Sequence, residues 1–281
     1  MHIVRWLIFA LLVSAVPAYA SDIKVSVTEV KDQRSTGQFF NNLEIKLNLI
    51  GDDAYAVRGI KTTINKAVDD TGRSLLLDKE KDDRFETVRE GGEGKAEVNL
   101  KFRNPARRAT VVKEITGELQ VFVSDQDPAA TVFIKGFMKT LGKPNGVPAL
   151  TKANVAVTVL TKKEYESLKK EEEKKAKDAA QKQGLTQAMM TAFEGLLGAF
   201  FQVGENDLIF KINDPSGTLV ELDVVDAKGS KIKTNGTMRS HDLIVLNYNE
   251  TIPADAQLRI FLKTQKSVIT MPLHLVDVAL P

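Results

Sequence analysis

Two stretches of the chain alternate apolar and polar residues with a period of two, the pattern of strands with one buried face. In the stretch 21–160 the clearest runs lie at 23–27, 43–49, 96–102, 119–123 and 155–159. In the stretch 205–281 they lie at 208–212, 219–225, 243–246, 258–262 and 268–278. Clusters of Gly, Asp, Asn and Pro separate the runs, as turns require.

Short strands with frequent turns are typical of antiparallel sandwiches. We therefore predict a mainly β fold with two antiparallel β-sandwich domains, immunoglobulin-like in architecture, joined by a helical insert. The N-terminal domain would cover residues 21–160, the insert residues 161–204, and a smaller C-terminal β domain residues 205–281.

The insert begins with a segment of helical character, residues 161–183. Thr161 and Glu164 have the spacing of a capping box, in which each side chain satisfies a free N–H of the first turn. Acidic residues then precede lysines by four positions, as in the pair Glu171 and Lys175. This segment predicts a solvated helix that stops near Gly184.

The next segment, 185–203, is apolar around most of a helical circumference. So wide an apolar arc exceeds what one domain surface requires, which predicts a second partner. Three readings remain open: packing between the β domains, a self-association interface, or insertion into a membrane surface. The polar strip of the segment lacks the Lys and Arg typical of the last reading. The candidate partner-binding residues are Met189, Met190, Phe193, Leu196, Leu197, Phe200 and Phe201.

Residues 1–20 have the three parts of a secretory signal. A basic start is followed by the apolar run 6–16, and Ala18-Tyr19-Ala20 is a small-x-small cleavage pattern. The apolar run is too short to span a bilayer as a helix. We therefore expect export to the periplasm or the extracellular space, a mature chain starting at Ser21, and no transmembrane span in that chain.

Composition after cleavage narrows the chemistry. Removing residues 1–20 takes away one of the 39 basic residues, Arg5, which leaves 38 against 37 acidic ones. This balance argues against nucleic acid as a partner. The chain has no Cys, which excludes thiol nucleophiles and cysteine-ligated metals, and its one Trp, Trp6, lies in the signal. No motif points to a cofactor.

Two charged features are candidate binding sites. Arg103, Arg107 and Arg108 lie in a short stretch between predicted strands, where guanidinium groups could contact a carboxylate or phosphate; a solvated loop is the alternative. The acidic turns 69–70, 82–83 and 125–127 could supply oxygen ligands to calcium, although turn chemistry alone also explains them.

Residues 104–109 and 115–119, together with the closing segments 271–273 and 278–281, resemble uncharacterised exported bacterial proteins built on β-sandwich domains. The resemblance implies an envelope location and β architecture. It implies no activity, because these families are uncharacterised.

No nucleophile elbow or phosphate-binding glycine loop is present in the sequence. We expect a non-enzymatic envelope protein that acts as a structural or protein-interaction module, which pairs with itself or with another envelope protein. A ligand- or polysaccharide-binding module and a carboxylate-dependent hydrolase are the alternatives.

Overall fold

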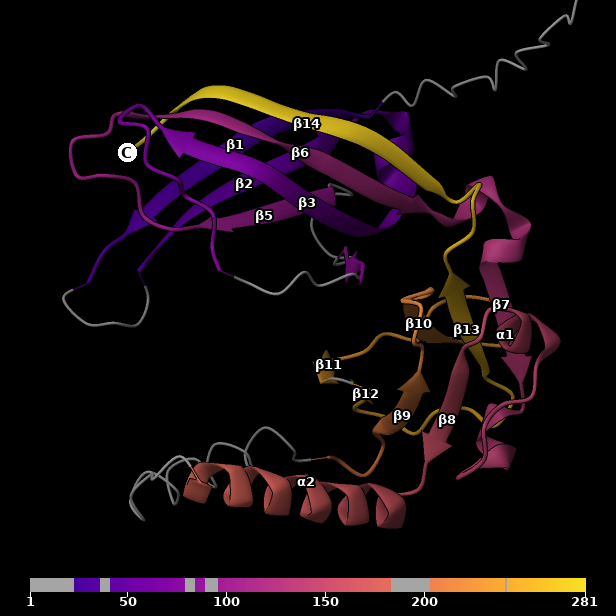
Figure 1. The fold of residues 1–281 in the computed structure, drawn as a ribbon. Coiled ribbons are helices and arrows are strands. Elements are labelled where there is room, and N and C mark those ends of the chain that lie inside the picture. The colour runs from indigo at the N-terminus through magenta and orange to yellow at the C-terminus, as the bar shows by residue number, and fades with distance from the viewer. Residues whose placement is uncertain (1–22, 36–40, 79–83, 89–95, 183–202, 241) are drawn as a thin grey trace, which may run out of the picture.

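The computed structural model describes residues 23–35, 41–78, 84–88, 96–182, 203–240 and 242–281, and all statements below concern these residues. The described chain is mainly β, with four antiparallel sheets (Figure 1). We name them sheet A (β1-β2-β5), sheet B (β14-β6-β3-β4), sheet C (β10-β13-β7) and sheet D (β11-β12-β9-β8).

The strands have the following bounds: β1 Lys24–Gln33, β2 Asn42–Ile50, β3 Val57–Asp69, β4 Glu86–Thr87, β5 Ala96–Phe102, β6 Val111–Val123, β7 Thr131–Lys135, β8 Ala156–Leu160, β9 Leu208–Asn213, β10 Leu219–Val225, β11 Gly236–Ser240, β12 Leu243–Asn247, β13 Gln257–Leu262 and β14 Val268–Ala279. The helices are α1 Pro148–Lys152 and α2 Lys162–Lys182, with short 3-10 turns η1 Asp52–Ala56, η2 Ser124–Gln126, η3 Pro128–Ala130 and η4 Phe137–Thr140.

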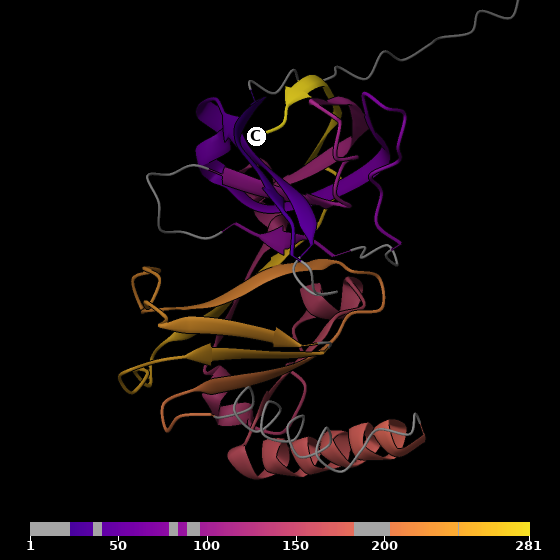
Figure 2. The same ribbon diagram turned by 90° about the vertical axis from the view of Figure 1, so that its left-hand side faces the viewer.

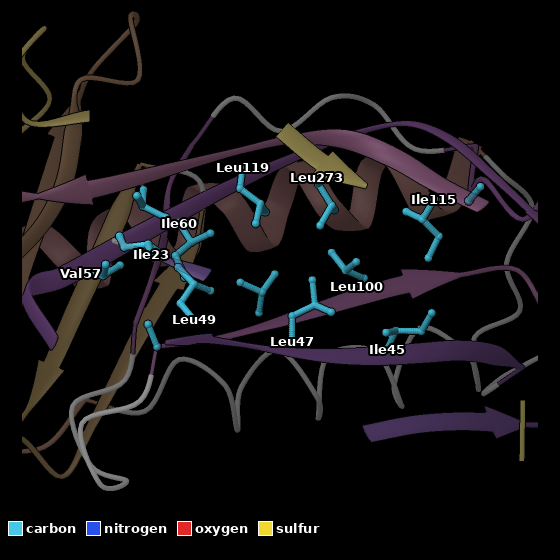
Figure 3. Close-up of a cluster of buried hydrophobic side chains, with 14 of the residues drawn as sticks. Ile23, Ile45, Leu47, Leu49, Val57, Ile60, Leu100, Ile115, Leu119 and Leu273 are labelled. Atoms are coloured by element: carbon cyan, nitrogen blue, oxygen red, sulfur yellow. The ribbon is translucent and has the colours of Figure 1, made fainter. Parts of the chain in front are cut away.

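Sheets A and B face one another across a shared hydrophobic core, and we call them the first sheet pair (Figure 3). The alternation predicted at 43–49 is confirmed in β2, because Leu43, Ile45, Leu47 and Leu49 are all buried. The side chains of β5 alternate in the same way, and those of β6 and β14 supply the opposite wall. Burial of these aliphatic faces is the main stabilising contribution to the pair.

Sheets C and D form the second sheet pair, with a separate core. Val157 and Val159 of β8, Phe210 and Ile212 of β9, and the inner residues of β10, β12 and β13 meet there. Figure 2 shows the second sheet pair below the first, with α2 along its far side.

Sheet membership does not follow the boundaries that the sequence pattern predicted. We expected β7 and β8 in the N-terminal domain, yet β7 pairs with β13 and β8 pairs with β9. We expected β14 in the C-terminal domain, yet it pairs with β6 along eleven positions from Val268 to Ala279. The second sheet pair is therefore inserted in sequence between β6 and β14. A period of two identifies strands but carries no information about their neighbours.

The two sheet pairs touch through a small aromatic cluster. Phe122 of β6 makes edge-to-face contacts with Phe85 at 6.3 Å and with Phe261 of β13 at 6.4 Å between ring centroids. The Arg58 guanidinium of β3 lies 4.4 Å from the centre of the Phe261 ring, within range of a cation–π interaction. A Cβ atom at Gly59 would meet the Val220 side chain at 2.6 Å, so glycine permits this close approach of β3 and β10.

The predicted charged helix is confirmed as α2. Its capping box forms as expected: the Glu164 carboxylate accepts hydrogen bonds from the Thr161 backbone N–H at 2.8 Å and from its hydroxyl at 2.7 Å. Glu171 and Lys175 pair at 3.0 Å. Tyr165 attaches the first turn by packing with Ile209 and Val245 on the outer face of sheet D. None of the helices in the described part of the chain combines the length and the apolar composition that a membrane span requires.

Candidate functional site

The apolar candidates at positions 189–201 lie outside the described residues. What the structure places is the point where the chain returns, at Val203, which packs with Tyr165, Ile209 and Val245. Leu160, Met238 and Leu243 join the same cluster on the outer face of sheet D. The predicted role of the segment stays a prediction.

The arginine candidates lie on the loop 103–110, which leads from β5 of sheet A to β6 of sheet B. The loop therefore crosses one end of the first sheet pair. It separates the three candidates: Arg103 forms an ion pair with Asp78, whereas Arg107 and Arg108 lie exposed in a turn. The acidic partner of Arg103 is therefore not shared with Arg107 or Arg108 in any ion pair of the described residues, and the three arginines do not form one charged cluster around it.

Asp69 at the end of β3 holds this loop in place. Its side chain is buried and accepts four hydrogen bonds, from the backbone N–H groups of Thr71, Arg73 and Ala106 at 2.8–3.0 Å and from the Thr71 hydroxyl at 2.7 Å. Burial alone would raise the pKa of Asp69, but these hydrogen bonds hold it below its ordinary value of 3.8. Asp69 is thus a structural carboxylate that stays ionised.

Two further carboxylates tie the loop to its surroundings. Asp70 accepts from the backbone N–H of Thr110 at 3.0 Å and from its hydroxyl at 2.8 Å, which lowers the pKa of Asp70. Asp32 on β1 accepts from the Asn104 amide at 2.6 Å and from Arg34. The loop that presents Arg107 and Arg108 is therefore fixed at several points.

The acidic turns are used in the same way where the structure describes them. Asp127 accepts from the backbone N–H of Ala129 at 3.0 Å and from the Thr264 hydroxyl at 2.7 Å. Residues 82–83 lie outside the described part. Within it, no group of three or more His, Asp or Glu side chains is placed to hold a metal ion.

A network of ion pairs around a buried aspartate lies on the outer face of sheet C and was not predicted from the sequence. Asp223 of β10 is almost fully buried and receives two hydrogen bonds from the Arg259 guanidinium of β13, at 2.8 and 2.6 Å. Lys231 lies 3.8 Å from Asp223 and 3.6 Å from Glu221. Glu221 also lies 3.9 Å from Arg58 of β3, so the network reaches the first sheet pair.

The signal for this network was present in the sequence as two acids, Glu221 and Asp223, within an otherwise apolar strand. Their partners come from distant positions, which only the strand register identifies. The Arg259 guanidinium lies 5.2 Å from the centre of the Phe261 ring, which places the network beside the aromatic cluster. Its position indicates a role in fixing the two sheet pairs relative to one another.

Comparison of the chain with protein-family models, with curated proteins and with solved structures found no match.

Proposed function

We propose that this chain is a non-enzymatic, exported envelope protein that acts as a structural or protein-interaction module. In this proposal the two sheet pairs are immunoglobulin-like β-sandwich domains and residues 1–20 are the export signal. The segment 161–204 is a helical insert between β8 and β9 of the second sheet pair, rather than a connection between the two domains as the sequence pattern predicted. The chain works in the periplasm or the extracellular space.

The observation that supports the proposal is the use of the buried polar side chains. Among the described residues, five polar or charged residues are buried, and each has a partner within the chain: Asp69, Ser124, Asn145, Asp223 and Ser267. Three further buried side-chain oxygens, those of Asn42, Asn48 and Tyr248, have no hydrogen-bond partner in the described part of the chain, and they lie on three different residues rather than around one acid–base group. Catalytic sites instead converge polar groups toward a position that a substrate can occupy. Polar groups committed to backbone and ion-pair contacts are typical of a scaffold.

The test is cross-linking in the envelope of cells that express the full chain. The processed protein should start at Ser21 and should form a discrete adduct with another envelope protein. A variant with Met189, Phe193, Leu197 and Phe200 changed to Ser should fold, judged by its circular dichroism, and lose that adduct. An unprocessed cytoplasmic chain, or an adduct that survives in the folded variant, would contradict the proposal.

A second candidate is binding of an anionic ligand or polysaccharide at Arg107 and Arg108. The fixed loop favours it, because Asp69 and Asp70 hold the backbone that carries both exposed arginines. Titration of the mature chain with an anionic oligosaccharide, beside an R107A/R108A variant, tests it. Binding that is equal in the two proteins would exclude this loop as the site.

A further inference from the structure

One side of the first sheet pair is closed by the chain itself. The backbone N–H of Leu75 donates to Ala67 of β3 at 2.9 Å, and the Leu75 carbonyl accepts from the N–H of Arg103, just after β5, at 2.8 Å. Leu75 therefore joins sheets A and B by main-chain hydrogen bonds, and its side chain is fully buried between them. This places β5 on the β3 side of the pair, so β1 and β14 share the opposite side.

That opposite side, which we call the open side, lacks such a closing segment among the described residues, except at one end, where the Asn104 amide donates to Asp32 and to the Gln33 carbonyl of β1. Eight inward-facing apolar residues there pack on the core but keep part of their surface exposed: Val25, Val27 and Val30 from β1, and Ile269, Met271, Leu275, Val278 and Leu280 from β14 and its end. The inward-facing residues of the neighbouring β2 are all at most 2% exposed. Incomplete burial of the core is thus concentrated along the open side.

The two strands at the open side differ as pairing edges. β14 carries Pro272 near its middle, and proline, which has no N–H to donate, is typical of edge strands that stay unpaired. β1 has no proline across its ten residues and pairs on one side only, with β2. Its backbone therefore presents an edge to which a further strand could be added.

The charges on β1 match a second copy of the same strand. Glu29 lies opposite Lys46, and Lys31 lies opposite Glu44, all on the outward face of sheet A. In an antiparallel pairing centred on Val30, Glu29 would face Lys31 of the second copy, and Lys31 would face Glu29 of the second copy. A row of four side chains would then cross the joined sheets, with charges of alternating sign. It would run from Lys46 and Glu29 of one copy to Lys31 and Glu44 of the second copy.

We propose that β1 pairs with β1 of a second copy of this chain, antiparallel and with the two Val30 residues opposite one another. On the inward face, Val30 of each copy would contribute to covering the open side. On the outward face, the Glu29–Lys31 pair, 2.8 Å apart in one copy, would join its symmetric equivalent in a cluster of two acids and two lysines. Opposite charges directly across antiparallel strands stabilise the pairing, whereas like charges oppose it. This inference rests on the proposed function in assigning the chain an interaction role.

The absence of cysteine from the chain makes the register directly testable. In the mature protein, residues 21–281, a Val30→Cys variant should form a disulfide-linked dimer under mild oxidation, because the two copies of this residue would lie opposite one another. A Val25→Cys variant is the matched control, since it replaces an inward-facing valine of the same strand. Its two copies would lie ten positions apart in register, too far for a disulfide.

The unmodified mature chain should show a concentration-dependent dimer by light scattering, and Lys31→Glu should raise the dimer dissociation constant by about tenfold or more. A mature chain that stays monomeric overturns the proposal, as does cross-linking at Val25 rather than Val30. Because these measurements use the purified chain alone, a negative result leaves the cross-linking test of the proposed function standing.

Discussion

The two sides of the first sheet pair solve the same packing problem differently. On the β5 side, Leu75 hydrogen-bonds to both sheets and completes the core within one chain. On the β1–β14 side, eight inward-facing residues remain partly exposed, and β1 pairs with no strand other than β2 among the described residues. A sandwich core can thus be closed by its own chain at one edge and leave the other edge available for association.

The largest expected effect is loss of the closing segment. Leu75→Ala should lower the free energy of unfolding by about 2–5 kcal/mol, because it removes a fully buried side chain and leaves a cavity between the sheets. Leu275→Ala, on the open side, is the matched control and should cost about 1 kcal/mol, because that side chain is already partly exposed. Urea denaturation of both variants measures the contrast. Equal losses would mean that the two sides are equally well packed.

A smaller effect is expected from the carboxylate that fixes the closed side. Asp69→Asn should cost about 1–3 kcal/mol near neutral pH, because the amide cannot accept all four hydrogen bonds as well as the carboxylate does. The substitution should also change how the stability of the protein depends on pH in the acidic range.

The sign of that response follows from the lowered pKa of folded Asp69. The stabilisation is present above the unfolded-state value, near 3.8, and is lost as the pH falls below it through the lowered folded-state pKa. Thermal unfolding between pH 5 and 2 should therefore show a shallower decline in Asp69→Asn than in the native chain. An equally steep decline in both proteins would show that these hydrogen bonds do not lower the pKa of Asp69 in the folded chain.

A variant at the proline of the open side tests which of the two edge strands, β1 or β14, pairs with a second copy. Pro272→Thr should lower the stability by only about 0.4–1 kcal/mol, through greater freedom of the unfolded chain. The dimer dissociation constant should stay within about twofold of the native value if pairing runs along β1. A marked gain in dimer affinity would instead identify β14 as the pairing edge.

The smallest effect is expected at the exposed partner of Arg103. Asp78→Asn should change the unfolding free energy by less than about 0.5 kcal/mol, because Asp78 is 91% exposed and surface ion pairs contribute little. Chemical denaturation at low and high salt measures it. A larger, salt-dependent loss would show that Arg103 serves to hold the segment that contains Leu75.

Much of the fold could be predicted where the pattern was regular. The runs in β2 and β5 alternate without interruption, and their burial follows the alternation. The strand β3 was missed because register shifts near Val57, Ile64 and Val68 interrupt its period. At one of these, a Cβ atom on Gly117 of β6 would collide with the Thr63 carbonyl of β3, so the glycine permits the irregular pairing.

The candidate sites were predictable in composition but not in arrangement. The arginines of the loop 103–110 could be identified in the sequence as a basic cluster. The pairing of Arg103 with Asp78 could not, because it joins residues 25 positions apart. The Asp223–Arg259 pair joins residues 36 positions apart through the β10–β13 register. Contacts of this kind have no local signal, because they depend on which strands become neighbours.

The mainly β character, the capped charged helix and the absence of cysteine chemistry could be predicted from the sequence, because each depends on residues close together in the chain. Three features are seen only in the folded chain: β14 returns to the first sheet pair, the second pair is inserted before it, and Leu75 closes one side and leaves the other open. These outcomes depend on long-range pairing, in which a strand is stabilised by whichever edge and core complement it, and a period of two does not specify that choice.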